Sequence, residues 1–343
     1  MEALRTDKLS VELDGFALKD ISLTVRKGRT TAVLGANEAG KTTLALAILQ
    51  QLEAKAKVHG KIYTQGNLLQ ESSFLQTYGR CITLTILLSA ALYYTPRADK
   101  WYWIPLIFIT VFVNCQFNRR TNKPKLGWSS ARMRRLGVAY ISSEHGAAQE
   151  LPEGCTIEEV IARDMPISDP EGRRREVIAA LVVAGFKMYD TDMKGPLDYI
   201  NHGVRISHCS GGQRQLIYIL AVLASRPKLL IADEILSGLD IDRQVSVLRM
   251  LQHLQRVSDL SIIYMTVDPF AARLMAHDAA FLHHGRIVES GPAHTFLIDQ
   301  YAKCSATRSY LDMCNAVPGR IVVNEEGECV GGGQLWEKMF KSR

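Results

Sequence analysis

The chain has 343 residues, a formal net charge of +6 and an ordinary globular composition, with 47% hydrophobic and 22% charged residues. This length can bury a sizeable core in one or two domains, and the composition argues against disorder. The seven cysteines include no Cys-x-x-Cys pair, which argues against a zinc site and against a secreted disulfide framework. The first twenty residues are mixed and charged, so no signal peptide is expected.

Most of the positive charge lies in one segment of the chain. Residues 71–128 hold seven basic and two acidic side chains, which account for +5 of the total charge and leave the rest nearly neutral. The basicity therefore belongs to this insert and not to a nucleic-acid-binding face of the domain. We therefore expect no nucleic acid partner.

A glycine-rich loop lies near the N-terminus, after two strands that alternating residues predict at 9–13 and 21–25. The loop follows an apolar run at 31–34 and leads into the helix-forming residues 44–49. Its nine positions are Gly35, Ala36, Asn37, Glu38, Ala39, Gly40, Lys41, Thr42 and Thr43. The order of strand, glycine loop, lysine, hydroxyl and helix is that of a phosphate-binding P-loop.

This loop has the groups that a nucleoside triphosphate requires. The glycines let backbone N–H groups turn toward the phosphates, and the helix N-terminus adds a favourable dipole. Lys41 is expected to reach the β- and γ-phosphates, and the Thr42 hydroxyl to ligate Mg²⁺. The alternative is a glycine turn that happens to precede a helix, and it leaves the match at every fixed position unexplained.

Two uncharged segments, residues 81–94 and 101–117, follow a short predicted strand at 61–64 and interrupt the domain. Their 14 and 17 residues lie at or below the roughly 17–25 that usually cross a bilayer. Aromatic residues at the turn between them, and basic residues at their outer ends, fit a membrane hairpin with cytosolic ends. We interpret the insert, residues 71–128, as such an apolar helical hairpin; a soluble helical insertion and translated non-coding sequence are the alternatives.

Strands and helices alternate after the insert. The predicted strands are 136–141, 229–231, 261–266 and 279–282, and the predicted helices are 171–187, 210–224, 242–257 and a short one near Pro269. Such alternation after a P-loop predicts an α/β domain with a largely parallel sheet. The polar stretch from about residue 296 is interpreted as an appendage with little core of its own.

A second group of motifs lies well downstream of the P-loop. The helix at 210–224 opens with Ser210, Gly211, Gly212 and Gln213. An apolar strand ends in Asp233 and Glu234, at the sheet edge where ligands bind in open α/β folds. Asp233 can hold Mg²⁺, and Glu234 can orient and deprotonate a water that attacks the γ-phosphate. Ser210 with two glycines at a helix start can bind an anion.

Together these motifs resemble the ATP-binding cassette (ABC) ATPase family, over roughly residues 8–70 and 129–295. Residues 227–234 look most like the oligopeptide and nickel importer branch. The resemblance implies a P-loop NTPase fold with a mostly parallel sheet, an N-terminal antiparallel β subdomain and a helical signature subdomain. It also implies ATP and Mg²⁺ as cofactors, and Phe16 as an aromatic residue that stacks on adenine, although a core role for Phe16 is equally open.

The resemblance further implies partners. Two cassettes, identical or different, would sandwich two nucleotides, so that Ser210 and its three neighbours meet the ATP held by the second cassette and Asp240 lies at the dimer interface. A separate membrane permease is implied as well, because one short hairpin cannot form a permeation pathway. The ATPase domain would then lie on the cytoplasmic face of a membrane.

The chain departs from the family pattern at several positions. Cys209 replaces the leucine that usually begins the signature, and Glu38 replaces a small residue in the P-loop. Ser143 stands where a metal-contacting glutamine is expected, with Gln149 six residues further on. Val267 replaces the switch histidine, and a valine side chain cannot hydrogen-bond a phosphate or a water. Nucleotide binding is therefore better supported than turnover.

Two functional hypotheses follow for a chain divided into residues 1–70, 71–128, 129–295 and 296–343. The first is an ATP-hydrolysing subunit of an ABC-type transporter, associated with a membrane. The second is a degenerate cassette that uses ATP binding to dimerise and to regulate a partner, with little hydrolysis. A DNA-repair mechanoenzyme is disfavoured, because such enzymes carry long charged coiled-coil insertions and this insert is short and apolar.

Overall fold

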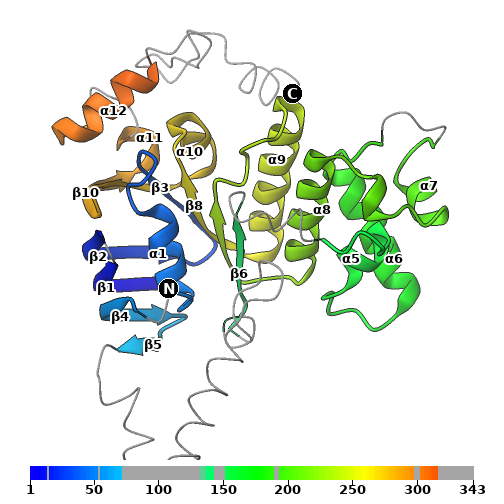
Figure 1. Ribbon diagram of the computed structural model, residues 1–343, viewed down its shortest axis with the longest axis horizontal. Helices are drawn as coiled ribbons and strands as arrows, with labels where there is room; N and C mark the ends of the chain where they lie inside the picture. Colours follow the sequence, from blue (N-terminus) through cyan, green and yellow to red (C-terminus); the bar gives the residue numbers. More distant parts are fainter. Residues whose placement is uncertain are drawn as a thin grey trace, which may run out of the picture.

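The computed structural model describes residues 1–13, 15–52, 55–71, 133, 136–142, 151–188, 193–296 and 302–315. An antiparallel sheet lies at the N-terminal end of the molecule, with strand order β2-β1-β4-β5 (Figure 1). Its strands are β1 (Glu2–Leu13), β2 (Phe16–Arg26), β4 (Lys57–Thr64) and β5 (Asn67–Glu71). This sheet is the predicted N-terminal antiparallel β subdomain.

A second sheet of six strands forms the centre of the fold, in the order β10-β9-β3-β8-β7-β6. Its strands are β3 (Thr30–Leu34), β6 (Val138–Ser142), β7 (Leu229–Asp233), β8 (Ser261–Thr266), β9 (Asp278–His283) and β10 (Arg286–Pro292). All neighbours are parallel except the edge pair β9–β10. The predicted α/β class with a mostly parallel sheet is therefore confirmed.

Helices cover both faces of the central sheet. Those described are α1 (Lys41–Ile48), α5 (Ile157–Ala162), α6 (Pro170–Val183), α7 (Pro196–Asn201), α8 (Gly211–Ala224), α9 (Ile241–Ser258), α10 (Pro269–Met275), α11 (Ala293–Phe296) and α12 (Ser305–Asn315), with a 3₁₀ turn η2 (Ile206–His208). Helix α6 ends four residues before the predicted boundary, because Gly185 adopts φ = 62° and terminates it.

Successive residues of the central strands point to opposite faces of the sheet. On β7, Leu229 and Ile231 join the cluster around α1, whereas Leu230 and Ala232 join the cluster around α8 and α9. This period of two is intrinsic to a strand, and burial on both faces explains why β7 is apolar throughout. Helix α1 thus lies between the two sheets, and α8 lies on the opposite side of the central sheet.

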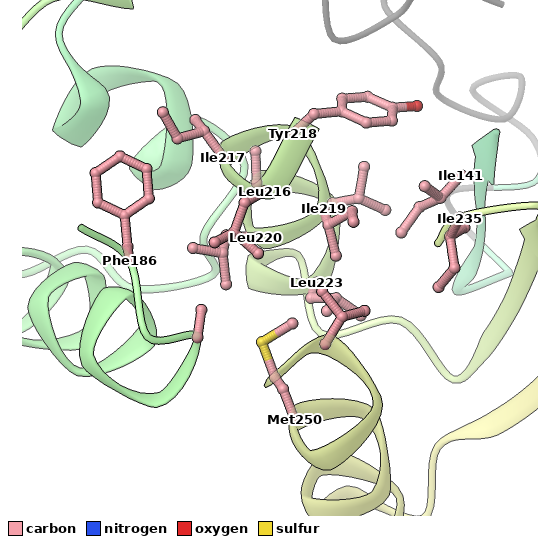
Figure 2. Packing of buried hydrophobic residues seen from close by; sticks show 14 of the residues in the cluster. Ile141, Phe186, Leu216, Ile217, Tyr218, Ile219, Leu220, Leu223, Ile235 and Met250 are labelled. Atoms are coloured by element: carbon pink, nitrogen blue, oxygen red, sulfur yellow. The ribbon is translucent and has the colours of Figure 1, made fainter. Parts of the chain in front are cut away.

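Helix α8 is buried more completely than its pattern predicts. The sequence predicts one apolar face that includes Leu216 and Leu220, but every residue from 216 to 223 is buried. Figure 2 shows the reason: Phe186 lies on one side of the helix, and Ile141 and Ile235 lie on the other. The helical subdomain of α5–α7 covers the face that would otherwise meet solvent, so α8 links this subdomain to the central sheet.

The predicted insert lies outside the described residues, apart from its first position in β5. In the part of the chain that the structure describes, no helix is both long and apolar enough to cross a membrane. The hairpin interpretation of residues 71–128 therefore stays a prediction.

The beginning of the C-terminal segment packs on the cassette. Helix α12 buries Leu311 and Cys314, and the ring of its Tyr310 lies 5.0 Å from that of Phe281 on β9. The Glu289 carboxylate on β10 accepts hydrogen bonds from the backbone N–H groups of Lys303 and Cys304, the two residues just before this helix, at 2.7 and 3.0 Å. Partial desolvation of Glu289 favours its neutral form, but these bonds outweigh that effect and lower its pKa. The appendage thus contains a helix that shares the core of the cassette.

Candidate functional site

The P-loop connects β3 to α1, and two of its glycines are required by close contacts. A Cβ atom at Gly35 would lie 2.4 Å from the carbonyl oxygen of Leu282. Gly40 adopts φ = 105°, and a Cβ there would lie 2.6 Å from Cζ of Phe16. Any other residue at either position would displace the loop. Glu38, at the exposed tip, has φ = 64°, an uncommon conformation for a residue with a side chain.

Lys41 is the first residue of α1, and its side chain is only 6% exposed. Its Nζ donates to the carbonyl oxygens of Gly35 and Ala36, at 2.9 and 3.1 Å. The same ammonium lies 3.4 Å from Oε1 of Glu234. The positive charge is therefore held against the inner side of the loop rather than in solvent.

Thr42 and Asp233 join the P-loop to the end of β7. The Thr42 hydroxyl donates to Oδ2 of Asp233 at 2.7 Å, and Asp233 is only 1% exposed. The hydroxyl of Tyr140 donates to the same oxygen at 3.3 Å. Burial raises the pKa of Tyr140, and the neighbouring carboxylate raises it further, so the phenol stays protonated. A buried carboxylate needs such donors, because desolvation without them is costly.

These oxygens suit Mg²⁺. A carboxylate and a hydroxyl are hard oxygen ligands, and they meet here at the first turn of the helix that follows the glycine loop. The remaining predicted residues of the loop surround this point. Ala36 and Asn37 are exposed at its tip beside Glu38, Ala39 is buried, and Thr43 lies in the first turn of α1.

Glu234 directly follows β7 in a left-handed conformation, with φ = 51°. Its backbone N–H donates to the carbonyl oxygen of Met265 on β8 at 3.0 Å, which fixes the turn. The side chain is 17% exposed and points to Lys41. The two carboxylates predicted from the sequence thus diverge: Asp233 turns to Thr42, and Glu234 turns to the ammonium.

Phe16, at the start of β2, lies against the P-loop. Its ring contacts the position where a side chain at Gly40 would stand, and the residue is partly buried against the cluster around α1. The structure therefore places this aromatic residue beside the phosphate loop, in a position compatible with either predicted role.

The predicted signature opens α8. Ser210 is the N-cap of this helix and forms a capping box with Gln213, in which each side chain binds the other's backbone N–H. Gln213 also donates to the carbonyl oxygen of Lys187 at 2.6 Å and is buried. Burial raises the pKa of the preceding Cys209 to about 11, so its thiol is neutral. Local hydrogen bonds thus hold the helix start rigidly.

Arg243 connects the signature to Asp240. A Cβ at Gly212 would lie 2.5 Å from Nη1 of Arg243, so the guanidinium covers this glycine. Asp240 caps α9 by accepting from the Arg243 backbone N–H at 3.0 Å, and it also lies 3.3 Å from Nε of the same arginine. Because α1 and α8 pack on opposite faces of the central sheet, the structure does not bring this group to the P-loop of its own chain.

The position expected for a switch histidine is Val267, just after β8. Its carbonyl oxygen accepts a hydrogen bond from the hydroxyl of Tyr310 on α12. The rings of His283 and His284, at the end of β9, have their centroids 4.1 Å apart. Ser143 and Gln149 lie outside the described residues. Tyr140, Arg243 and Tyr310 make contacts that no sequence motif indicates.

We expect the Tyr310→Phe variant to lower the free energy of unfolding by about 1 kcal/mol, the usual net value of a hydrogen bond. The ring would keep its contact with Phe281, while the carbonyl of Val267 would lose its donor. Chemical denaturation measures the difference. Tyr63→Phe is the matched control, since the ring under Arg5 keeps its place. Equal stability of wild type and Tyr310→Phe would show that the hydrogen bond to Val267 does not stabilise the fold.

The fold and this site define the class of protein. A glycine loop between β3 and α1, a buried lysine, and the carboxylates of Asp233 at the end of β7 and of Glu234 just after it are the arrangement typical of P-loop proteins. The family model described as "ABC transporter" matches residues 18–86, a range that begins in β2 and ends inside the predicted insert.

Relatives and solved structures agree with this match. A protein of Brucella abortus that carries the name of a peptide import ATP-binding protein is 26% identical over 80% of this chain and 63% of its own length. The oligopeptide transport ATP-binding protein OppD of Bacillus subtilis is 30% identical over 50% of this chain and 45% of its own length. The chain thus spans about half to three fifths of the length of these relatives.

Among solved structures, an ATP-binding cassette of an ABC transporter in its ADP conformation has a TM-score of 0.54. Its sequence is 15% identical to this one, and the match covers 90% of this chain and 98% of the cassette. A dimeric cassette in a post-hydrolysis state bound to ADP and Pi has a TM-score of 0.53, with 15% identity over 85% of this chain and 99% of its own. The chain has the fold of these ABC cassettes, and its sequence is similar to those of ATP-binding proteins of ABC transporters.

Proposed function

We propose that the chain is the ATP-binding and ATP-hydrolysing subunit of an ABC-type transporter. The observation that carries this proposal is the convergence of Lys41, Thr42, Asp233 and Glu234 at the point where the P-loop meets β7. The names of the relatives support peptides as the transported class.

In this proposal the P-loop holds the phosphates of ATP. Backbone N–H groups of residues 35–43 and the ammonium of Lys41 bind phosphate oxygens, and Phe16 contacts the adenine. Thr42 and Asp233 would hold Mg²⁺, which when bound neutralises charge on the phosphates. Lys41 already lies inside the loop, so it has to exchange carbonyl partners for phosphate oxygens rather than travel from solvent.

Glu234 is the proposed general base. It accepts a proton from the water that attacks the γ-phosphorus, while the bond from that phosphorus to the β,γ-bridging oxygen breaks. The backbone hydrogen bond to Met265 and the contact with Lys41 restrict where this carboxylate can point. Restriction of this kind is what efficient proton transfer needs, because the base must lie within hydrogen-bonding reach of the water.

The proposal includes a dimer and a membrane. Ser210, Gly211, Gly212, Gln213 and Asp240 would act on the nucleotide of a second cassette, and one of the structural neighbours is itself a dimeric cassette. The cassette would consist of residues 1–70 and 129–295 and would work with a separate permease at the cytoplasmic face. We retain residues 71–128 as a proposed membrane hairpin; carbonate extraction of native membranes tests it, and recovery of the full-length chain in the soluble fraction would contradict it.

A second candidate function is a nucleotide-gated regulatory cassette with little hydrolysis. The observation that favours it is Val267, whose side chain has no polar atom and whose carbonyl is held by Tyr310. The hydrogen bond from Tyr310 on α12 holds the loop after β8 in place, although this loop has no histidine at position 267. In this alternative ATP joins two cassettes, and their separation does not depend on turnover of this chain.

Titration calorimetry and a phosphate-release assay on the full chain separate these functions. We expect the wild-type chain to bind Mg·ATP and to release phosphate steadily, with the rate rising when the chain dimerises. ATP-dependent dimerisation without phosphate release would favour the regulatory candidate. A chain that binds no nucleotide would contradict both.

A further inference from the structure

The carboxylate at the end of β7 receives a hydrogen bond that the P-loop does not supply. Oδ2 of Asp233 accepts from Thr42 at 2.7 Å and also from the phenol of Tyr140 at 3.3 Å. Tyr140 is 5% exposed and comes from β6, the edge strand beside β7. The phenol thus reaches Asp233 from a neighbouring strand, independently of the glycine loop and its helix.

Strand pairing fixes this contact. β6 and β7 are parallel, with Ser142 opposite Asp233 and Tyr140 opposite Ile231. Tyr140 and Ile231 belong to the cluster around α1, so by the period of two Asp233 faces the same side as Tyr140. Neighbours diagonal in a sheet lie within reach of a long aromatic side chain. The donor is therefore attached to a rigid strand rather than to a mobile loop.

The phenol is suited to act only as a neutral donor toward this carboxylate. Burial and the adjacent negative charge both raise its pKa, and the Ser142 side chain hydrogen-bonds to it. A hydrogen bond to a charged acceptor is stronger than one between neutral groups, and donors in a chain polarise one another. The phenol is hydrogen-bonded to both Ser142 and Asp233. Because it is held in this way, it restricts the rotation of the Asp233 carboxylate.

We propose that Tyr140 is the positioning residue of Asp233: its hydroxyl fixes the carboxylate in the orientation that holds Mg²⁺ in the Mg·ATP complex. The inference rests on the proposed function and deepens it. Groups that hydrogen-bond a metal-holding carboxylate orient it and typically change metal affinity about 10- to 100-fold when they are removed. Tyr140 would touch neither the nucleotide nor the attacking water.

The test compares ATP binding with and without Mg²⁺ in the Tyr140→Phe variant of the full chain. Calorimetry gives the affinity for ATP in chelator, and a Mg²⁺ titration at saturating ATP gives the metal affinity of the complex. We expect the metal affinity to fall about 10- to 100-fold, with the metal-free ATP affinity within twofold of wild type. Tyr63→Phe, which also loses one phenol, should change neither value.

A double-mutant cycle separates positioning from a general structural effect. In an Asp233→Asn background, Tyr140→Phe should cause no further loss of metal affinity, because the oriented carboxylate is already absent. Ser142→Ala, which keeps the phenol but removes the side chain that hydrogen-bonds it, should lower the Mg²⁺ affinity by less than Tyr140→Phe does. It provides a second probe if Tyr140→Phe folds poorly.

Three results would overturn the inference. They are an unchanged Mg²⁺ affinity in Tyr140→Phe or in Ser142→Ala, an equal loss of metal-free and metal-dependent binding, and an additive double mutant. Each would leave the proposed function intact as long as wild type binds Mg·ATP. A wild-type chain that binds no ATP would overturn the proposed function and this inference with it.

Discussion

The Glu234→Gln variant is expected to bind ATP at least as tightly as wild type and to lose roughly 10²- to 10⁴-fold in turnover, the range that a positioned general base contributes. Glutamine has the same shape and can still hydrogen-bond, but it cannot take the proton of the attacking water. The substitution also removes a negative charge 3.4 Å from Lys41, and this leaves the ammonium more available to phosphate oxygens.

Two measurements establish this result. Single-turnover phosphate release gives the chemical rate, and equilibrium binding of ATP gives the affinity on the same preparation. Glu12→Gln is a matched control, because Glu12 lies exposed on β1, where its carboxylate faces Lys57. If Glu234→Gln hydrolyses ATP at the wild-type rate, Glu234 is not the base.

The class of fold could be predicted because its signals are local. The P-loop and the apolar strand before Asp233 and Glu234 each occupy a few consecutive residues, and each strand or helix of the alternating pattern is read from its own short segment. A parallel sheet then brings the ends of β3 and β7 to one edge whatever the rest of the chain does. The meeting of Thr42 and Asp233, 191 residues apart, follows from that single rule.

Other contacts depend on register, which no local pattern gives. Tyr140 reaches Asp233 because Ser142, and not Ile141 or Tyr140, lies opposite it in the β6–β7 pair. A shift of one residue would turn the phenol to the other face of the sheet. The period of two within each strand is readable from the sequence, but the offset between the strands is not.

Local patterns also fail to predict how a helix packs against residues that are distant in the sequence. The sequence around helix α12 indicates only a polar appendage, since a short helix can contribute few apolar groups of its own. Its Tyr310 contacts Phe281 on β9 and the carbonyl of Val267 in the loop after β8, both far from α12 in the sequence. Likewise the pattern of α8 predicts an amphipathic helix, because its second buried face meets a subdomain that is built elsewhere in the chain.

The Lys41→Met variant is expected to lose roughly 10²- to 10⁴-fold in ATP affinity, since two charge-assisted hydrogen bonds to phosphate oxygens contribute about 1.5–3 kcal/mol each. Methionine keeps an unbranched apolar stem, so the site between Gly35 and Glu234 stays filled while the charge disappears. Glu234 then loses its nearby cation, and its negative charge repels the phosphates. Lys41→Arg should not restore affinity, because a planar guanidinium does not fit where a compact ammonium contacts two carbonyl oxygens.

Fluorescence anisotropy of a labelled ATP analogue measures this loss, with a thermal melt to verify the fold. Lys27→Met is the matched control: Lys27 lies just before β3, at the end of that strand opposite to the P-loop, and its exposed ammonium faces Asp259. Loss of affinity in both variants would indicate a general effect of charge, whereas loss in Lys41→Met alone supports the loop as the phosphate site. Wild-type affinity in Lys41→Met would place the nucleotide elsewhere.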